Sequence, residues 1–122
     1  MTTSVLLVDD SPIARSALRR ALPDDWDVRI EEVADGVEAL QRYRAGEVDV
    51  MFLDLVMPRM DGYQVLKTLQ SEGLNCCVIV VSAETHAGVR ARVLALGAIA
   101  FLRKPINPLG LREALREYGV RV

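Results

Sequence analysis

The sequence predicts an α/β protein in which a parallel five-stranded sheet is covered by helices on both faces. Apolar runs of strand length alternate with segments of helical periodicity along all 122 residues. Such strict alternation is typical of a parallel sheet whose strands are joined by right-handed helical crossovers. A chain of this length fits one domain, so we expect residues 1–122 to form a single unit with one core.

The first strand and helix lie near the N-terminus. Residues 5–8 are all apolar, which predicts a buried strand. Ser11 and Pro12 follow as a helix N-cap and a proline of the first turn. We expect this helix to end near Leu22-Pro23.

The second unit begins with a strand over residues 28–33. Asp35 then stands three residues before Glu38, an arrangement that resembles a capping box. This pattern predicts a helix that runs through Tyr43 to Gly46.

The third unit begins with the apolar run 50–53, which ends at Asp54. Residues 55–60 form a predicted loop. Asp61 is the expected cap of the next helix, and Gly73 is its expected end.

The fourth unit contains a strand over residues 78–81, directly before Ser82. Thr85 is the predicted cap of a helix that ends at Gly97. Gly88 weakens the first turn, so we expect this helix to be the least stable one.

The fifth unit has a strand over residues 99–102 and a helix that starts at Asn107-Pro108 and reaches Tyr118. Two strand orders are common for such an alternation, and one of them is the flavodoxin-like order 2-1-3-4-5. In that order the strands that precede Asp10, Asp54, Ser82 and Lys104 lie side by side, and their carboxyl ends share one edge of the sheet.

Charge and composition limit the partners. Fifteen basic and seventeen acidic residues leave a net charge of −2, which gives no general attraction to nucleic acid or to an anionic membrane. No apolar run is long enough to span a membrane, and the N-terminus does not resemble a signal peptide. The two cysteines, Cys76 and Cys77, are neighbours and make a poor disulfide. We therefore expect a soluble cytoplasmic protein.

The predicted sheet edge is rich in carboxylates. Asp9 and Asp10 follow the first strand and Asp54 follows the third. At close range these groups repel one another unless a cation lies between them. An all-oxygen set suits Mg²⁺, which also accepts oxygens of a phosphate.

Asp54 is the best placed nucleophile, because it ends a central strand between the acidic pair and the pair Ser82 and Lys104. Attack of its carboxylate on phosphorus would give an acyl phosphate. Mg²⁺, the Lys104 ammonium group and the Ser82 hydroxyl would then each neutralise or bind one phosphoryl oxygen.

Four motifs together resemble the response-regulator receiver domain, the CheY-like family of two-component signalling. They are Val8-Asp9-Asp10-Ser11, Leu53-Asp54 with Met57-Pro58-Arg59-Met60-Asp61-Gly62, Val81-Ser82-Ala83, and Lys104-Pro105. The resemblance covers essentially the whole chain and implies a (βα)5 CheY-like fold.

By this resemblance Asp54 is the phosphoacceptor and Asp9 and Asp10 are the metal-binding pair. The backbone carbonyl of Val56 is implied as a further Mg²⁺ ligand. No other cofactor is implied.

The resemblance also assigns residues for switching. Ser82 is the switch hydroxyl, Lys104 is the phosphate-binding lysine, and Phe101 is the aromatic switch residue. The Phe101 ring is expected to turn inward when Ser82 moves toward the phosphate. The Lys104-Pro105 peptide bond is expected to be cis.

The implied partners are a histidine kinase or histidine phosphotransfer protein as donor, and a downstream protein or fused output domain as target. The readout surface would comprise the helix after Ser82, the strand at 99–102 and the final helix, which could also form a homodimer. The protein is then a switch, not an enzyme with a separate substrate, and contacts neither nucleic acid nor membrane directly.

Val56 departs from the polar residue that many relatives carry beside the phosphate. A valine cannot orient a hydrolytic water, so we expect slow autodephosphorylation. Glu84, two residues after Ser82, is expected at the mouth of the site, open to water or a partner.

Three alternatives remain. A phosphatase of the haloacid dehalogenase type also forms an aspartyl phosphate, but it generally needs an acid at the position of Val56. A flavodoxin-like cofactor carrier is disfavoured because Asp9 and Asp10 would repel a nucleotide phosphate. A pseudo-receiver that binds partners without phosphorylation is disfavoured by the complete site.

Several other residues have no predicted role in the chemistry. His86 is expected at the surface and Trp26 in the packing between the first helix and the second strand. Solvent-facing positions are expected for Arg59, Arg90, Arg92 and Arg103.

Overall fold

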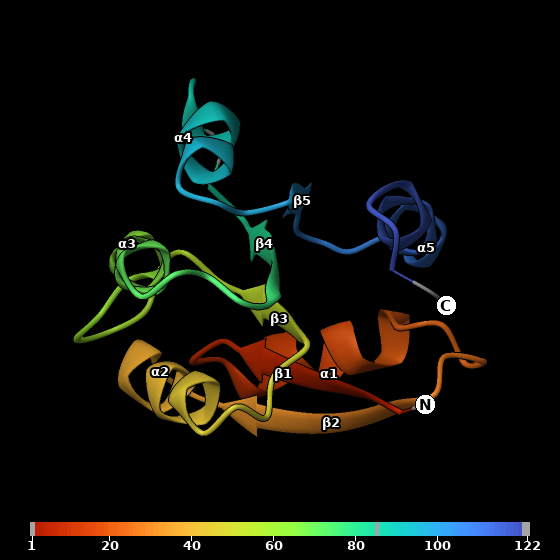
Figure 1. Cartoon of the computed structure of the whole chain (residues 1–122). Coiled ribbons are helices and arrows are strands. Elements are labelled where there is room, and N and C mark those ends of the chain that lie inside the picture. Colours follow the sequence, from red (N-terminus) through yellow and green to blue (C-terminus); the bar gives the residue numbers. More distant parts are fainter. Residues whose placement is uncertain (1, 85, 121–122) are drawn as a thin grey trace.

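The computed structural model describes residues 2–84 and 86–120, and it contains the predicted alternation of strands and helices (Figure 1). All strand pairings are parallel, and the strand order is β2-β1-β3-β4-β5, as predicted. In chain order the elements are β1 (Thr3–Val8), α1 (Pro12–Ala21), β2 (Val28–Val33), α2 (Gly36–Arg44), β3 (Val50–Leu53), α3 (Gly62–Ser71), β4 (Cys77–Ser82), α4 (Val89–Ala95), β5 (Ala100–Arg103) and α5 (Pro108–Glu117).

The sheet separates two hydrophobic layers (Figure 1). Helices α2, α3 and α4 cover one face, where they pack on alternate strand residues such as Leu6 and Met51. Helices α1 and α5 cover the other face, where they pack on the intervening residues, such as Leu7 and Phe52. The inner strands are thus buried on both faces, as the continuous apolar runs predict.

Four of the predicted helix caps are present, at Ser11, Asp35, Asp61 and Asn107. The side chain of Ser11 accepts a hydrogen bond from the backbone N–H of Ala14, and Asn107 caps α5 in the same manner. Asp61 forms a complete capping box with Gln64 at the start of α3. These side chains satisfy N–H groups that have no partner within the helix.

The capping box expected at α2 is only half formed. Asp35 accepts a hydrogen bond from the backbone N–H of Glu38 at 2.9 Å. The side chain of Glu38, however, accepts from the N–H of Ala34 rather than from that of Asp35. The Asp35 carboxylate also binds Arg59, which joins the start of α2 to the loop before α3.

Helix α4 begins later than predicted. Its first residue is Val89, and the predicted cap, Thr85, lies outside the described residues. Gly88 has a φ of 85°, a left-handed conformation that a right-handed helix cannot continue through. Gly88 therefore marks the start of α4, and among residues 2–84 and 86–120 no side chain caps that end.

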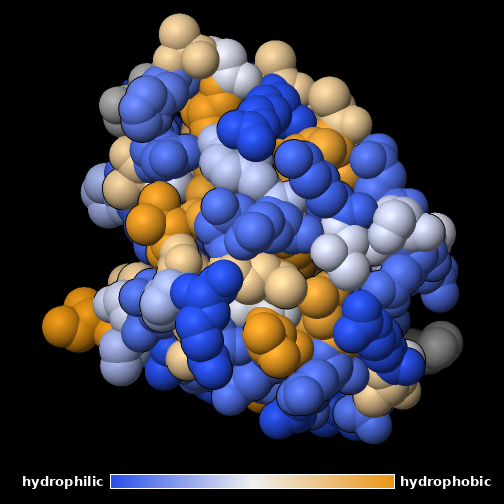
Figure 2. Space-filling view, turned by 90° about the vertical axis from the view of Figure 1, so that its left-hand side faces the viewer, coloured by the Kyte–Doolittle hydropathy of each residue, from blue (hydrophilic) through white to orange (hydrophobic). Residues whose placement is uncertain are grey.

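The outer surface is mixed in character. On the face of α2, α3 and α4, hydrophobic residues appear as separate spots among hydrophilic ones (Figure 2). In the described part of the chain, no helix combines the length and the apolar character that a membrane crossing requires. Trp26 is buried in the α1–α5 layer, as predicted, while Cys76 and Cys77 are half-buried free thiols.

Replacement of Gly62 by alanine should destabilise the fold. A Cβ atom at Gly62 would lie 2.5 Å from the backbone oxygen of Asp54 and 2.8 Å from Cα of Leu55, and backbone atoms cannot move aside cheaply. Urea unfolding should show that Gly62→Ala lowers the free energy of unfolding by about 1–3 kcal/mol.

Gly110→Ala is the matched control, because the nearest atom to a Cβ there is 3.7 Å away, in ordinary contact. In helix α5 this change should raise stability by up to about 1 kcal/mol. Equal stability of Gly62→Ala and the wild type would contradict the close approach of Gly62 to the backbone of Asp54 and Leu55.

Candidate functional site

Strand register brings the predicted acidic residues together. Val8 of β1 pairs with Leu53 of β3, so Asp9 and Asp54, the next residue of each strand, emerge side by side. The backbone N–H of Asp54 donates to the carbonyl of Val8 at 3.0 Å, which continues the ladder to the edge. The carboxyl ends of parallel strands thus meet where a ligand site is expected.

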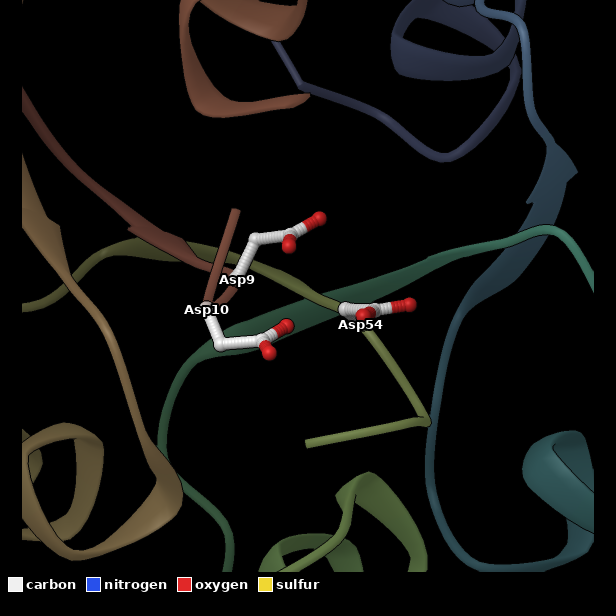
Figure 3. A group of neighbouring side chains, drawn as sticks. All are labelled: Asp9, Asp10 and Asp54. Carbon is white, nitrogen blue, oxygen red and sulfur yellow. The ribbon is translucent and has the colours of Figure 1, made fainter. Parts of the chain in front are cut away.

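Asp9, Asp10 and Asp54 form one cluster (Figure 3). Each offers a carboxylate oxygen, and these oxygens all lie within 4.8 Å of one another. Asp9 and Asp54 are buried, whereas Asp10 is exposed. The site is therefore closed by protein on two sides and open to water at Asp10.

The loop after β3 is anchored at its end and near its middle. The N–H of Gly62 donates to the carbonyl of Leu55 at 2.9 Å, and Arg59 binds the carboxylate of Asp35. Arg59 has a φ of 66°, an unfavourable value for a side chain larger than that of asparagine. The loop that carries Val56 therefore has a defined path beside Asp54.

Lys104 lies against the acidic cluster. Its backbone N–H donates to the carbonyl of Ser82 at 3.0 Å, which places it at the end of β5 next to β4. Its Nζ atom lies 2.6 Å from Oδ2 of Asp9 and 3.6 Å from Oδ1 of Asp54. The Lys104-Pro105 peptide bond is cis, as expected.

The Lys104 ammonium group stays protonated in this setting. Burial lowers the pKa of Lys104, but the hydrogen bond to Asp9 and the negative charges of Asp54 and Asp9 outweigh it. The net pKa therefore lies above the usual lysine value. Lys104 accordingly supplies a fixed positive charge to the cluster.

Asp54 holds its proton more tightly than an ordinary aspartate does. Burial is the main cause, followed by the charge of Asp9, while Lys104 and hydrogen bonds from the backbone of Leu55 and Val56 act in the opposite direction. The net effect raises the pKa of Asp54 to about 6. At neutral pH most of the Asp54 side chains are therefore still ionised and able to act as nucleophiles.

All polar groups of Asp9 are engaged. Its carboxylate accepts from the N–H of Ser11 at 2.9 Å as well as from Lys104. Its backbone N–H donates to the carbonyl of Val33, and its carbonyl accepts from Arg15. Asp9 is thus held in one orientation from four directions.

Ser82 and Phe101 both lie inside the protein. Ser82 is completely buried, and its Oγ atom accepts a hydrogen bond from the N–H of Glu84 at 3.1 Å. Phe101 is 4% exposed as a residue and packs in the same layer as α4, so its ring is already inward in this conformation. Arg90 donates to the carbonyl of Phe101 at 3.2 Å and lies over its ring.

The four arginines expected to face solvent are exposed, as predicted, and three of them also contact other residues of the protein. Besides Arg59 and Arg90, Arg92 stacks over the ring of Tyr63 at 3.8 Å. The Glu84 carboxylate accepts a hydrogen bond from the Tyr63 hydroxyl at 2.9 Å, a contact that the sequence did not predict. His86 is at the surface, as predicted, with Nδ1 3.9 Å from the other Glu84 oxygen.

The donor set at this edge fits a hard divalent cation. Three carboxylates offer oxygens alone, and the exposed Asp10 leaves room for the waters that Mg²⁺ keeps. The use of the Val56 carbonyl as a ligand stays a prediction.

Comparison with known sequences identifies related proteins. The family model described as "Response regulator receiver domain" matches residues 5–116. The chain is 36% identical over 105 residues to Response regulator MprA of Mycobacterium ulcerans, covering 86% of this chain and 45% of MprA. It is 40% identical over 130 residues to protein-glutamate methylesterase/protein-glutamine glutaminase 2 of Nitratidesulfovibrio vulgaris, covering 97% of this chain and 35% of the relative. The chain thus spans less than half the length of these two relatives.

Solved structures share the same fold. One is a complex of CheX and CheY with BeF3 and Mg from Borrelia burgdorferi, with a TM-score of 0.86, 29% identity, and coverage of 98% of this chain and 90% of that one. Another is the response regulator domain of CheB from Thermotoga maritima, with a TM-score of 0.82, 27% identity, and full coverage of both chains.

Removing the Asp54 charge should stabilise the metal-free protein at high pH. The folded protein binds the Asp54 proton more tightly than the unfolded chain does, since the pKa rises from 3.8 to about 6. The stability that this proton contributes is complete below pH 3.8 and is lost as the pH rises through about 6. The stability advantage of Asp54→Asn over the wild type should therefore grow by about 1–2 kcal/mol between pH 5 and pH 8.

Urea unfolding in the presence of a chelator measures this difference. Asp24→Asn, at an exposed position outside the cluster, is the control for the loss of one carboxylate. A stability difference between Asp54→Asn and wild type that stays constant from pH 5 to pH 8 would rule out a raised Asp54 pKa.

Proposed function

We propose that Asp54 is the phosphoacceptor of this chain, which belongs to the family of response regulator receiver domains and is thus a signalling switch of two-component systems. The observation that carries the proposal is the placement of Asp54. Asp54 is only 7% exposed and lies at the end of β3, next to Asp9. Its Oδ1 atom is 3.6 Å from Nζ of Lys104. No other carboxylate of the cluster is both buried and central in this way.

The proposed reaction is transfer of a phosphoryl group from a phosphohistidine. An Asp54 oxygen attacks phosphorus, the P–N bond of the donor breaks, and the imidazole leaves with its electron pair and takes up a proton. The product is an acyl phosphate on Asp54. Since most of the work is positioning and charge neutralisation, the rigid setting of Asp54 and Lys104 suits this chemistry.

Lys104 is the proposed phosphate-binding residue. Its Nζ atom already lies beside Asp54, so oxygens added there would come within its reach. In the resting protein the same ammonium group is bound to Asp9 at 2.6 Å, which keeps it at the site.

Asp9, Asp10 and Asp54 are the proposed Mg²⁺ ligands, together with the carbonyl of Val56. When bound, Mg²⁺ would supply positive charge to a phosphoryl oxygen. The acidic cluster supports this assignment. The related CheY of Borrelia burgdorferi was solved with BeF3 and Mg, which also favours it.

Ser82 is the proposed switch hydroxyl and Phe101 the proposed aromatic switch residue. The hydroxyl would turn from its loop position toward a phosphoryl oxygen, and the buried ring would stay packed beneath α4 in the phosphorylated state. This change would act on the surface made by α4, β5 and α5, our proposed contact for a downstream protein, a fused output domain or a second copy of this chain.

The donor is proposed to be a histidine kinase or a histidine phosphotransfer protein in the cytoplasm. The methylesterase activity in the name of the Nitratidesulfovibrio vulgaris relative is not proposed here, because this chain covers only 35% of that protein. Within residues 1–122 we propose no activity beyond phosphorylation and slow dephosphorylation of Asp54.

A phosphatase of the haloacid dehalogenase type is not supported. The residue two positions after Asp54 is Val56, whose exposed aliphatic side chain cannot act as a general acid or base.

Incubation with Mg²⁺ and acetyl phosphate tests the proposal. Intact-protein mass spectrometry should show one phosphoryl group per wild-type chain, and peptide mapping should locate it on Asp54. Asp54→Asn should gain none, whereas Asp49→Asn, which changes a carboxylate at the opposite end of β3, should still be phosphorylated. Continuous release of phosphate without a stable adduct would favour a phosphatase, and no reaction together with no beryllofluoride binding would favour a pseudo-receiver.

The lifetime of the adduct should depend on Val56. Val56 is 62% exposed, two residues after Asp54, and its side chain offers no hydrogen bond to an attacking water. Val56→Asn should shorten the lifetime about threefold or more, as expected for one added water-orienting hydrogen bond. Val56→Leu is the apolar control and should leave the lifetime long. Loss of phosphate from purified adduct measures it, and a short wild-type lifetime that Val56→Asn does not change would contradict this role.

A further inference from the structure

Tyr63 connects helix α3 to the segment that follows Ser82. Its hydroxyl donates to Oε2 of Glu84 at 2.9 Å, and Glu84 lies between β4 and α4. The guanidinium group of Arg92, on α4, stacks over the same ring at 3.8 Å. One tyrosine on α3 is thus in contact with both the β4–α4 segment and α4 itself.

Glu84 is held at two points. Its backbone N–H donates to Oγ of Ser82 at 3.1 Å, while its side chain accepts from Tyr63. The Ser82 hydroxyl oxygen therefore belongs to the same network as the Tyr63 hydroxyl. Both bonds are partly shielded from water, because Ser82 is buried and the Glu84 side chain is 23% exposed.

The Tyr63 hydroxyl stays protonated and so remains a hydrogen-bond donor in this network. Burial raises the pKa of Tyr63, and the hydrogen bond to the Glu84 carboxylate raises it further. The hydroxyl therefore keeps its proton at neutral pH. A hydrogen bond to a charged acceptor is stronger than one to a neutral acceptor.

A Ser82 hydroxyl that turns toward Asp54 gives up its place in this network. Its oxygen would no longer face the N–H of Glu84, so the Glu84 backbone must move or lose its partner. Since Tyr63 is fixed in the first turn of α3, movement of Glu84 would also break or stretch the bond to the Tyr63 hydroxyl.

We propose that Tyr63, acting through Glu84, is a positioning residue that holds the Ser82 hydroxyl in its resting place and so opposes the change to the signalling conformation. The inference rests on the proposed function, because it requires Ser82 to move toward a phosphoryl group on Asp54. A hydrogen bond made in only one of two conformations shifts the populations toward that conformation. It lowers the affinity of any ligand that binds the other conformation by the same factor.

Tyr63→Phe removes the hydroxyl and leaves the ring beneath Arg92 in place. With Mg²⁺ present, isothermal titration should show that this variant binds beryllofluoride, a phosphoryl mimic, about 3- to 10-fold more tightly than the wild type, as expected for one hydrogen bond to a charged group. Without beryllofluoride, the same variant should unfold at a lower urea concentration. A merely structural role would lower stability without tightening binding.

Tyr43→Phe is the matched control. Its hydroxyl accepts from the backbone N–H of Asn75, a contact between the C-terminal end of α2 and the segment before β4. It therefore loses a tyrosine hydroxyl in a hydrogen bond outside the network, and its beryllofluoride affinity should equal that of the wild type.

Replacement of Glu84 gives a second test. Glu84→Ala removes the acceptor and should tighten beryllofluoride binding as Tyr63→Phe does, whereas Glu84→Gln keeps an acceptor oxygen and should lie nearer the wild type. Unchanged or weaker binding by Tyr63→Phe, with normal binding by the wild type, would overturn this inference and leave the proposed function standing. Failure of the wild type to bind beryllofluoride with Mg²⁺ would overturn both.

Discussion

The attraction between the Lys104 ammonium group and the carboxylates of Asp9 and Asp54 balances a repulsion that the fold itself creates. Parallel register forces Asp9 and Asp54 to emerge from neighbouring strands, and Asp10 follows directly. In a partly buried setting, like charges at such distances cost free energy unless a cation is present. The hydrogen bond from the Lys104 N–H to the carbonyl of Ser82 fixes the backbone of Lys104 beside β4, at the same edge of the sheet as the cluster.

In the proposed function, Lys104 serves two purposes at one position. In the resting protein it reduces the repulsion among the carboxylates, and beside a phosphorylated Asp54 it would lie near new phosphoryl oxygens. The two purposes use the same charge, since the ammonium lies 2.6 Å from Asp9 and 3.6 Å from Asp54. An external cation that binds Asp9 would share that carboxylate with Lys104 and would be attracted by the charge that remains on Asp10 and Asp54.

Patterns local in the sequence predicted most of the fold and the identity of the clustered residues. Alternation of apolar runs and helical periodicity implies parallel strands, and the caps at Ser11, Asp61 and Asn107 depend only on residues within one turn. Contacts that long side chains make between distant parts of the chain could not be predicted from such local patterns. Arg92 reaches Tyr63 across 29 positions of the sequence, and the partner of such a side chain depends on how α3 and α4 lie together. The sequence predicted too early a start for α4. The helix begins only at Val89, because the left-handed conformation of Gly88 ends the irregular segment just before it.

The contacts around Tyr63 lie on the α3–α4 side of the molecule and include none of the three clustered carboxylates. In our proposals, the phosphoryl chemistry and the preference for the resting conformation therefore depend on different side chains. A lineage that gained or lost the single hydroxyl at this position would change how strong a stimulus the protein needs before it responds. The proposed metal ligands and the proposed phosphoacceptor would stay untouched, so sensitivity could evolve by single substitutions at no cost to the reaction.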